Sequence, residues 1–475
     1  MTETDVLIIG AGLLGCFTAR NLTRYDISVT VLEKEDDVCR GISKANTGII
    51  YSGYNNRPGT EKQKLCVQAN EEFDRLCSEL EVPFSRPGSL MVGYDPKADA
   101  VIARKYSDGV RGGIKGLRLM SGSEAEAMEP ALVKGITFAL YSPETGTVDP
   151  WELCIAAYEN AADNGAKFVF GCRVTDVKRE NGGFKVWTEG DTFFAKVLVN
   201  AAGLSSDTIR EMTEKPFIRL FPSAADYIVL DRQAGNAVDH IILHEGEDGK
   251  GLTIVPTVDG NLLIGPTNRE AADNGTHEHD MRTDAGGLDI LRDLCAEIVP
   301  GIDMSLQIRT FGSLRPDPYY VSQSGGSVIK REDSIKDIRV TEEDGLISLI
   351  GIKTPGLTFS NELGKIVAEK AAALAGRTQP NAGFDPHRKA IVRARDLNAE
   401  ERAALIAQDS AYGEVICSCM DVTAAEVIQA MGRGAHDFES VKRRTGAGFG
   451  RCQGSRCRRK ITDLIKTYEQ GENRT

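Results

Sequence analysis

The chain has 475 residues and a formal net charge of −12 at pH 7, and its composition, 41% hydrophobic, is that of a globular protein. This length exceeds one ordinary core, so we expect two or three domains. The acidic balance excludes a general nucleic-acid binder, whose binding surface would be a basic domain. We find no signal peptide in the sequence and no apolar stretch long enough to cross a bilayer.

Cysteine usage favours a reducing compartment. The 11 cysteines are an odd number in a chain without an export signal, which indicates the cytoplasm and not a disulfide scaffold. Seven are scattered singly, and we expect these to be small buried side chains. The other four cluster near the C-terminus and require a chemical explanation: Cys417, Cys419, Cys452 and Cys457.

The N-terminal residues predict one βαβ unit. DVLII at 5–9 is a strand pattern, CFTARNLTRY at 16–25 a helix pattern, and ISVTVLE at 27–33 a second strand pattern. A glycine-rich turn, GAGLLG at 10–15, joins the first strand to the helix.

This turn has the spacing GxGxxG, with Gly10, Gly12 and Gly15, and Glu33 ends the second strand. Such glycines allow a tight turn, let the backbone approach a pyrophosphate, and let helix and strand pack closely. The pyrophosphate lies against the amides at the helix N-terminus, and the acid accepts hydrogen bonds from ribose hydroxyls. The unit predicts a dinucleotide site that includes Leu14, without separating FAD from NAD.

The rest of the chain continues the alternation of helices and strands. Helix patterns occur near 60–80 and at 151–164, and strand patterns occur at KFVFG, FKVWT and KVLVN. From about 215 to 320 strand and turn signals dominate, as in TIVPTVDGNLLIGPT. After the helix pattern NELGKIVAEKAAALAG, a segment rich in proline, glycine and polar residues predicts a domain boundary near residue 376. A charged, helix-like LNAEERAALIAQ then leads to the cysteine cluster.

The cysteine cluster has the arrangement CxC and, further on, Cx4C, which suits either a [2Fe-2S] cluster or a structural zinc ion. The spacing of the cysteines alone favours neither the [2Fe-2S] cluster nor the zinc ion. Between Lys442 and Lys460 the chain carries several basic residues and no acidic ones. Such a run is usually a solvated face. It could also stabilise a negatively charged cluster, or bind an acidic electron carrier.

Two stretches of the tail, ICSCMDVTAAEVIQAM and KRRTGAGFGRCQGSRC, resemble the [2Fe-2S] domain similar to bacterioferritin-associated ferredoxin. This domain forms the tail of several flavin dehydrogenases. The resemblance implies a [2Fe-2S] cluster in preference to zinc, with the four clustered cysteines as ligands.

The first 375 residues resemble FAD-dependent oxidoreductases of the D-amino-acid oxidase superfamily, in the branch of anaerobic glycerol-3-phosphate dehydrogenases and L-2-hydroxyglutarate dehydrogenases. Besides the glycine turn, the matching stretches are SKANTGIIYSGYNNRPGTEKQKLCVQAN, VLVNAAGLSSD, GLTIVPTVDGNLLIGPTN, FGSLRP and GIKTPGLTFS. This resemblance selects FAD over NAD.

The resemblance implies an α/β fold with a Rossmann-like FAD-binding domain and an interleaved α+β substrate domain. The FAD-binding segments are about 1–80, 145–215 and 325–375, and the substrate domain is about 81–144 and 216–324 within an oxidoreductase region of 1–375. Residues 376–413 are then a linker, and 414–470 a small helical [2Fe-2S]-binding domain.

The resemblance also implies cofactor contacts beyond the glycine turn. Ser43, Asn46 and Gly48 would lie along the flavin, and Val174 would offer its backbone to the adenine. The cofactor's phosphate and ribose region would lie near Ala201, Ala202 and Gly203. The final helix would open at the flavin pyrimidine edge with backbone amides that favour the charge of the reduced flavin. Its residues are Pro355, Gly356, Leu357 and Thr358.

Three residues are the predicted catalytic set. Arg315, in a Gly-x-Arg-Pro-like position, would hold a substrate carboxylate or phosphate by paired hydrogen bonds. Tyr51 stands where related dehydrogenases commonly have histidine, so the base is in doubt. Lys353 precedes the Pro-Gly-Leu turn and is either a second anion-binding group or a solvent-facing lysine.

These observations predict a cytoplasmic FAD-dependent dehydrogenase that removes a hydride from a small anionic hydroxy substrate, either glycerol 3-phosphate or a 2-hydroxy acid such as 2-hydroxyglutarate. Electrons would leave through the [2Fe-2S] cluster to a partner protein, a flavoprotein or a quinone-linked subunit. Two alternatives are a non-catalytic electron-transfer subunit and an amine or amino-acid dehydrogenase of the same superfamily.

Overall fold

The structure is a computed structural model, and it describes residues 1–244, 251–271, 281–324 and 327–472. The chain forms two compact units, Met1–Pro386 and His387–Thr475. The segment 376–413, predicted to be a linker, contains helix α9 (Ala399–Gln408), which corresponds to the helix-like LNAEERAALIAQ. The domain boundaries given above stay predictions.

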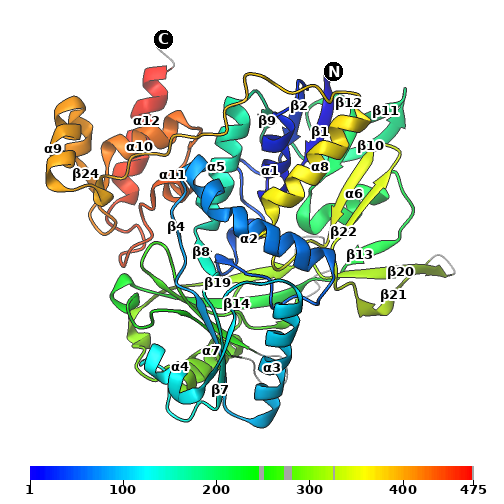
Figure 1. The fold of residues 1–475 in the computed structure, drawn as a ribbon. Coiled ribbons are helices and arrows are strands. Elements are labelled where there is room, and N and C mark those ends of the chain that lie inside the picture. Colours follow the sequence, from blue (N-terminus) through cyan, green and yellow to red (C-terminus); the bar gives the residue numbers. More distant parts are fainter. Residues whose placement is uncertain (245–250, 272–280, 325–326, 473–475) are drawn as a thin grey trace. The chain divides into compact units, whose positions relative to one another are not determined.

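The first unit contains a mostly parallel sheet around β1 (Thr2–Ile9), seen in Figure 1. β1 pairs in parallel with β2 (Val29–Leu32) and with β12 (Thr192–Asn200). The remaining strands are β9 (Lys167–Val169), β10 (Val174–Glu180), β11 (Gly183–Thr188), β22 (Arg339–Glu343) and β23 (Leu346–Ile350). Residues from Asp5 to Ile9 are buried because helices and neighbouring strands cover them, as is typical of parallel sheets.

Three helices pack together beside this sheet: α1 (Leu13–Leu22), α5 (Pro150–Asp163) and α8 (Ser360–Leu374). α2 (Glu61–Leu80) packs against α5 and α8, as Figure 1 shows. Gly364 permits the close contact of α8 with α1, since a Cβ there would lie 2.9 Å from the backbone of Phe17. The βαβ unit predicted from the N-terminal sequence is therefore formed by β1, α1 and β2.

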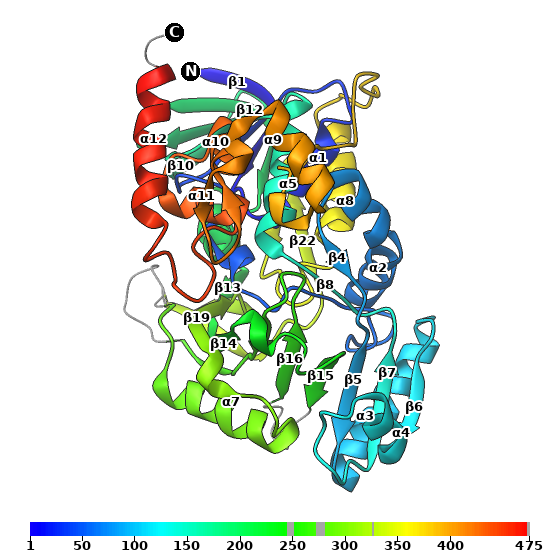
Figure 2. The same ribbon diagram turned by 90° about the vertical axis from the view of Figure 1, so that its left-hand side faces the viewer.

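A second sheet of the first unit is mostly antiparallel. Its path is β18 (Arg269–Glu270), β14 (Ser223–Leu230), β17 (Leu262–Ile264), β16 (Leu252–Pro256), β15 (Ile241–His244), β5 (Ser89–Gly93), β7 (Phe138–Ser142) and β6 (Arg118–Ser121), with β19 (Gln307–Arg315) paired to β14. Figure 2 shows α7 (Ala285–Ile298) beside the β14 end, and α3 (Pro96–Arg111) with α4 (Gly122–Met128) beside the β7 end. The predicted TIVPTVDGNLLIGPT hairpin is formed by β16 and β17.

Smaller sheets complete the first unit. One contains β3 (Ile49–Ile50), β4 (Phe84–Ser85) and β8 (Gly146–Val148), and another contains β13 (Ile218–Leu220), β20 (Pro318–Ser324) and β21 (Ser327–Ser334). The first large sheet draws strands from three separated segments, and the second draws strands from the two segments between them. The predicted α/β fold with a Rossmann-like sheet is thus confirmed, and the assignment of the interleaved part to the substrate stays a prediction.

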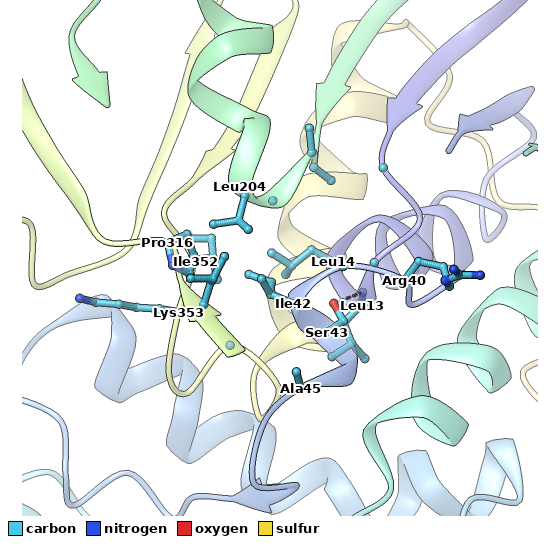
Figure 3. A pocket seen from close by; sticks show the side chains of 18 of the residues that line it. Leu13, Leu14, Arg40, Ile42, Ser43, Ala45, Leu204, Pro316, Ile352 and Lys353 are labelled. Carbon is cyan, nitrogen blue, oxygen red and sulfur yellow. Dashed lines mark hydrogen bonds between the residues drawn. The ribbon is translucent and has the colours of Figure 1, made fainter. Parts of the chain in front are cut away.

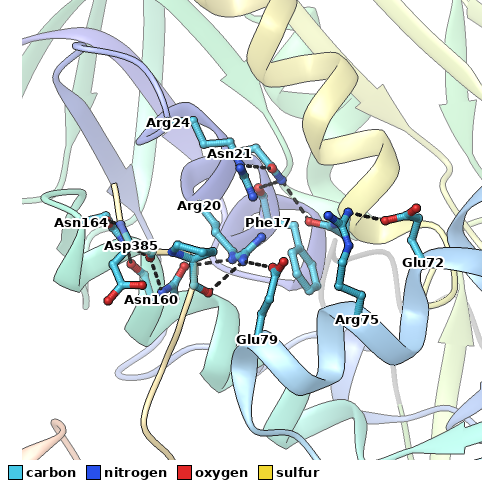
Figure 4. Close-up of polar contacts among 12 residues, drawn as sticks. Phe17, Arg20, Asn21, Arg24, Glu72, Arg75, Glu79, Asn160, Asn164 and Asp385 are labelled. Carbon is cyan, nitrogen blue, oxygen red and sulfur yellow. Dashed lines mark hydrogen bonds and ion pairs between the residues drawn. The ribbon is translucent and has the colours of Figure 1, made fainter. Parts of the chain in front are cut away.

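A buried arginine fastens the last segment of the first unit to its helices, as Figure 4 shows. The Arg20 side chain is 1% exposed and pairs with Glu79 at 3.0 Å. Its Nε donates to Oδ1 of Asn160 at 2.9 Å, and its Nη2 also donates to the carbonyl oxygen of Pro386 at 3.1 Å. Arg20 on α1 thus joins three partners, on α2, on α5 and in the terminal segment.

The second unit is small and largely helical, with its own apolar core around Val422, Val427, Val441 and Ile461. After α9, its elements are β24 (Val415–Cys417), β25 (Val422–Thr423), α10 (Ala424–Gly432), α11 (Phe438–Thr445) and α12 (Arg458–Glu472). The prediction of a small helical C-terminal domain is confirmed. Over the described part of the chain, no helix has the length and apolar character needed to cross a membrane.

Candidate functional site

A cavity of about 510 Å³ lies in the first unit between the glycine turn after β1 and the end of β19. Figure 3 shows that Leu14, Ile42 and Leu204 point toward a common space, whereas the Lys353 side chain extends away from them. This volume is within the range of ligand and cofactor sites, and the wall combines apolar side chains with a few polar groups.

Most of the predicted site residues line this cavity. They are Gly10, Gly12, Leu14, Glu33, Ser43, Asn46, Tyr51, Val174, Ala201, Ala202, Gly203, Arg315, Lys353, Pro355, Gly356 and Leu357. Three other residues predicted to contact the flavin cofactor do not line it, namely Gly15, Gly48 and Thr358. Residues separated by more than three hundred positions in the sequence are thus brought together by the two sheets.

The glycine turn is built for close backbone approach. Gly10 has a φ of +104°, and a Cβ at this residue would lie 2.5 Å from the carbonyl oxygen of Ala201. Gly15, although outside the cavity wall, packs α1 onto the turn, because its Cβ would lie 1.9 Å from the carbonyl oxygen of Gly10. Larger residues would push apart the turn and β12, where a dinucleotide must fit.

Glu33 directly follows β2, and its carboxylate is directed back to the turn. It accepts hydrogen bonds from the amide of Ala11 at 2.7 Å and from the amide of Glu35 at 3.0 Å. Burial raises the pKa of Glu33 above its usual value, although both amide hydrogen bonds oppose this shift. Glu33 also lines the cavity, where its carboxylate can accept a hydrogen bond from a ribose hydroxyl.

The segment with Ser43, Asn46 and Gly48 folds over the start of α1. The Ser43 hydroxyl accepts from the amide of Leu13 at 3.1 Å, which occupies a free donor at the helix N-terminus. Asn46 donates to the carbonyl oxygen of Ser43 at 2.8 Å and accepts from the amide of Gly48 at 2.9 Å. Asn46 thus holds the loop in shape.

The predicted helix opening at 355–358 is a turn. Helix α8 begins only at Ser360, and the amide of Gly356 donates to the carbonyl oxygen of Lys353 at 2.7 Å. Pro355 has no amide to donate. Thr358 lies behind the wall, where its hydroxyl accepts from the amide of Tyr51 at 3.1 Å. Turn residues and not a helix end therefore form this part of the wall.

Arg315, the last residue of β19, is held by neutral oxygens. Its Nη1 donates to Oδ1 of Asn268 at 3.0 Å, and its Nη2 donates to the carbonyl oxygen of Thr267 at 3.1 Å. The Tyr227 side chain is a further hydrogen-bonding partner. None of these partners carries a carboxylate, so the positive charge of the guanidinium is available to an anionic ligand.

Tyr51 and Lys353 differ in environment. Burial raises the pKa of Tyr51 to about 12, although a hydrogen bond with Thr47 opposes the shift. Its phenol therefore keeps its proton at neutral pH. Lys353 forms an ion pair with Asp317, whose carboxylate also accepts from the hydroxyl of Ser223 at 2.6 Å.

The sequence analysis missed several groups around this site. Tyr227 lines the cavity, is 4% exposed, and stacks on Phe311 with a centroid distance of 4.5 Å. Burial and then the charge of Lys353 lower the pKa of Lys62 to about 8. No local motif marks these residues, since only the pairing of β14 with β19 and the packing of α2 bring them near Arg315 and Lys353.

The four clustered cysteines of the second unit lie in two pairs. The thiols of Cys419 and Cys452 are hydrogen-bonding partners, and so are those of Cys417 and Cys457. The loop between α11 and Cys452 passes close to the first pair, because a Cβ on Gly450 would lie 2.6 Å from Cβ of Cys419. The predicted ligands are thus brought together across thirty-two intervening residues.

Backbone donors support negative charge on these sulfur atoms. Burial raises the pKa of the Cys452 thiol, but hydrogen bonds from the amides of Arg456 and Gly454 and from the Cys419 thiol outweigh it and bring the pKa to about 7. Burial and the neighbouring Cys417 raise the pKa of Cys457 to about 12. Bound metal would take the place of the proton at such a thiol.

Within the described residues, no three His, Cys, Asp or Glu side chains converge on a position for a single metal ion. A [2Fe-2S] cluster takes two thiolates at each of its two irons. The two pairs of cysteines, with backbone amides directed at the Cys452 sulfur, suit such a cluster.

Comparisons with known proteins agree with both sites. A family model described as "FAD dependent oxidoreductase" matches residues 5–370, and one described as "BFD-like [2Fe-2S] binding domain" matches residues 415–467. The predicted FAD and [2Fe-2S] cofactors are thereby confirmed, and the glycine turn, Glu33 and the paired cysteines provide groups that suit them.

Two curated relatives and one solved structure illustrate the similarity. A "Glycerol 3-phosphate dehydrogenase" of Caloramator mitchellensis is 34% identical over 97% of this chain and 93% of its own. A mitochondrial "L-2-hydroxyglutarate dehydrogenase" of Nematostella vectensis is 27% identical over 78% of this chain and 90% of its own. An L-alpha-glycerophosphate oxidase structure from Mycoplasma pneumoniae with FAD bound has a TM-score of 0.71 at 23% identity, and covers 82% of this chain and 99% of its own.

Proposed function

Because the chain belongs to the family of FAD-dependent oxidoreductases and ends in a BFD-like [2Fe-2S] binding domain, we propose that it is a dehydrogenase for a small anionic alcohol. Glycerol 3-phosphate is the first candidate substrate, because the dehydrogenase of Caloramator mitchellensis matches this chain over nearly its whole length. A 2-hydroxy acid such as 2-hydroxyglutarate is the second, since the relative of that name matches a smaller part.

The observation that carries this proposal is the charge of Arg315 at the cavity wall. Its partners, Thr267, Asn268 and Tyr227, are neutral, so a substrate phosphate or carboxylate would provide the missing negative charge. A guanidinium can hold either group by two parallel hydrogen bonds, and such bonds also fix the orientation of the substrate.

The other predicted catalytic residues have distinct proposed roles. Tyr51 keeps its proton below its pKa of about 12, so it would donate a hydrogen bond to a substrate oxygen and would not act as the base. Lys353 is neutralised by its ion pair with Asp317 and extends away from the apolar wall of the cavity, so we assign it no direct contact with the substrate. Bound FAD supplies the hydride acceptor, and the residues of the cavity position the substrate carbon and exclude water.

Electrons must leave the protein after substrate oxidation. A secondary alcohol gives up two electrons and two protons on becoming a ketone, whereas a [2Fe-2S] cluster passes one electron at a time. We assign the exit to the cluster held by Cys417, Cys419, Cys452 and Cys457, and the acceptor to a partner protein, a flavoprotein or a quinone-linked subunit. In the structure, no disulfide joins any of the eleven cysteines, which supports the proposal of a cytoplasmic location.

An anaerobic substrate screen tests this function. Glycerol 3-phosphate should bleach the flavin of the purified protein, with 2-hydroxyglutarate as the alternative and amino acids as the substrates of a rival amine dehydrogenase. If no compound bleaches a flavin that dithionite reduces, the non-catalytic electron-transfer subunit is the better description. Iron and labile sulfide analysis of the same sample distinguishes the cluster from zinc.

A further inference from the structure

The two cysteine pairs of the second unit differ in exposure. Cys417 is 1% exposed and Cys457 is fully buried, whereas Cys419 and Cys452 are only half-buried. Because each iron of a [2Fe-2S] cluster is bound by one pair of thiolates, the two irons would differ in their distance from solvent. The iron at Cys419 and Cys452 would be nearer to a partner that approaches through water.

Two arginines flank the half-buried pair. Arg451 directly precedes Cys452, and the backbone amide of Arg456 donates to the Cys452 thiol. Both side chains are exposed, and the described part of the second unit gives neither of them a carboxylate partner. Their charge therefore faces solvent beside the accessible sulfur atoms.

Two neighbouring cations, Arg458 and Lys442, contact other side chains of the unit. Arg458 pairs with Glu439 at 3.2 Å and lies 4.1 Å from the centroid of Phe438. Lys442 is 6% exposed and lies over the ring of Phe449. These side chains stabilise the fold of the unit, so the uncompensated charge at Arg451 and Arg456 calls for a different explanation.

We propose that Arg451 and Arg456 form the docking surface for an acidic one-electron carrier protein, and that electrons leave through the Cys419–Cys452 side of the cluster. This proposal rests on the proposed function and specifies its partner. Complementary charge raises the rate at which carrier and donor meet, and an exposed arginine retains its charge at any physiological pH.

The electron count fixes how the carrier is used. One substrate molecule yields two electrons and two protons, the protons pass to solvent, and two carrier molecules are each reduced by one electron. A short-lived, charge-steered contact suits this use, since the first carrier must leave before the second can bind.

The test compares an R451E/R456E double variant with K466E. Lys466 is also exposed, but it lies nine residues beyond Cys457 along α12, about 13 Å of helix. Each protein is reduced with dithionite and desalted anaerobically, so the measurement does not depend on any substrate. The probes are an acidic and a basic c-type cytochrome, with reduction rates at low and moderate salt and binding affinities for the oxidised cytochromes.

We expect the double variant to reduce the acidic cytochrome at least tenfold more slowly at low salt, to bind it more weakly, and to favour the basic cytochrome. K466E should match the unmodified protein, and iron content and the paramagnetic spectrum of the reduced cluster should be unchanged. The proposal would be overturned if the double variant and the unmodified protein reduced and bound the acidic cytochrome equally well. It would also be overturned if the variant changed the paramagnetic spectrum of the cluster but kept its preference for the acidic cytochrome. Failure of glycerol 3-phosphate to bleach the flavin would instead count against the proposed function.

Discussion

Arg315 and Asn268 are joined by a hydrogen bond of 3.0 Å between Nη1 and Oδ1, although Arg315 ends β19 and Asn268 lies forty-seven positions earlier, directly before β18. The contact arises because β14 pairs with β18 through Ala224 and Arg269, and with β19 through Ser223 and Arg315. The cation that we propose for substrate binding is thus oriented by a neighbour that the sequence does not mark.

Replacement of Arg315 should weaken substrate binding without loss of flavin. We expect R315A to raise the Michaelis constant about 10- to 100-fold, since a charge-assisted hydrogen-bond pair contributes about 1.5–3 kcal/mol. R315K retains the charge but loses the paired geometry, so its Michaelis constant should lie between those of the unmodified protein and R315A. Steady-state kinetics and flavin absorbance measure both quantities. An unchanged Michaelis constant in R315A would remove this residue from the site.

Asn268 should act on the substrate only through Arg315. N268A removes one neutral hydrogen bond, so we expect a rise in the Michaelis constant of about fivefold, with a small effect on kcat. In an R315A background the same change should have almost no further effect, because its partner is absent. A double-mutant cycle measures this coupling, and fully additive effects would show that Asn268 acts independently.

Gly10 should be essential for flavin retention. An added methyl group at G10A would meet the carbonyl oxygen of Ala201 at 2.5 Å and would be strained at a φ of +104°. We expect a folded protein with most of its FAD lost, measured as the ratio of flavin to protein. G190A is the control, since a Cβ there has no atom within 4 Å. Full flavin occupancy in G10A would contradict the assignment of the turn.

Lys62 should make stability depend on pH. Its folded-state pKa is about 8, against an ordinary value of 10.5, because burial and then the charge of Lys353 penalise its protonated form. The penalty is complete below pH 8 and disappears as pH rises toward 10.5. We therefore expect K62M to have a higher Tm than the unmodified protein at pH 7, with a difference that shrinks between pH 8 and pH 10.5. A constant difference across that range would be inconsistent with this shift.

Arg20 should contribute strongly to the stability of the first unit. R20A leaves Glu79 and Asn160 without their buried partner, and we expect it to lower the free energy of unfolding by about 3–5 kcal/mol. R75A is the matched control from the same region (Figure 4), because the Arg75–Glu72 pair is exposed and such pairs contribute at most about 1 kcal/mol. Chemical denaturation measures the free energy of unfolding of both variants. Similar losses of stability in R20A and R75A would show that burial does not make the Arg20 contacts more important.

Local sequence patterns were sufficient to predict several elements of the fold and the cysteine site. The glycine turn, Glu33 and the alternating apolar residues of 5–33 predict the βαβ unit, because periodicity and turn chemistry act between near neighbours. The four clustered cysteines identify a metal site for the same reason, since their spacing lies within one short module. Even the rough extent of α2, α5 and α8 follows from apolar spacing alone.

Tertiary structure decided how distant residues meet. Whether Arg315 has a carboxylate or a neutral partner depends on the register of β14 with β18 and β19, and the turn at Pro355 replaces an expected helix start because Gly356 bonds back to Lys353. The division of the cysteines into a buried and a half-buried pair likewise depends on packing around α10 and α12. Sequence sets the local conformation of each segment, but charge compensation, burial and pKa depend on non-local neighbours, which only the folded chain brings together.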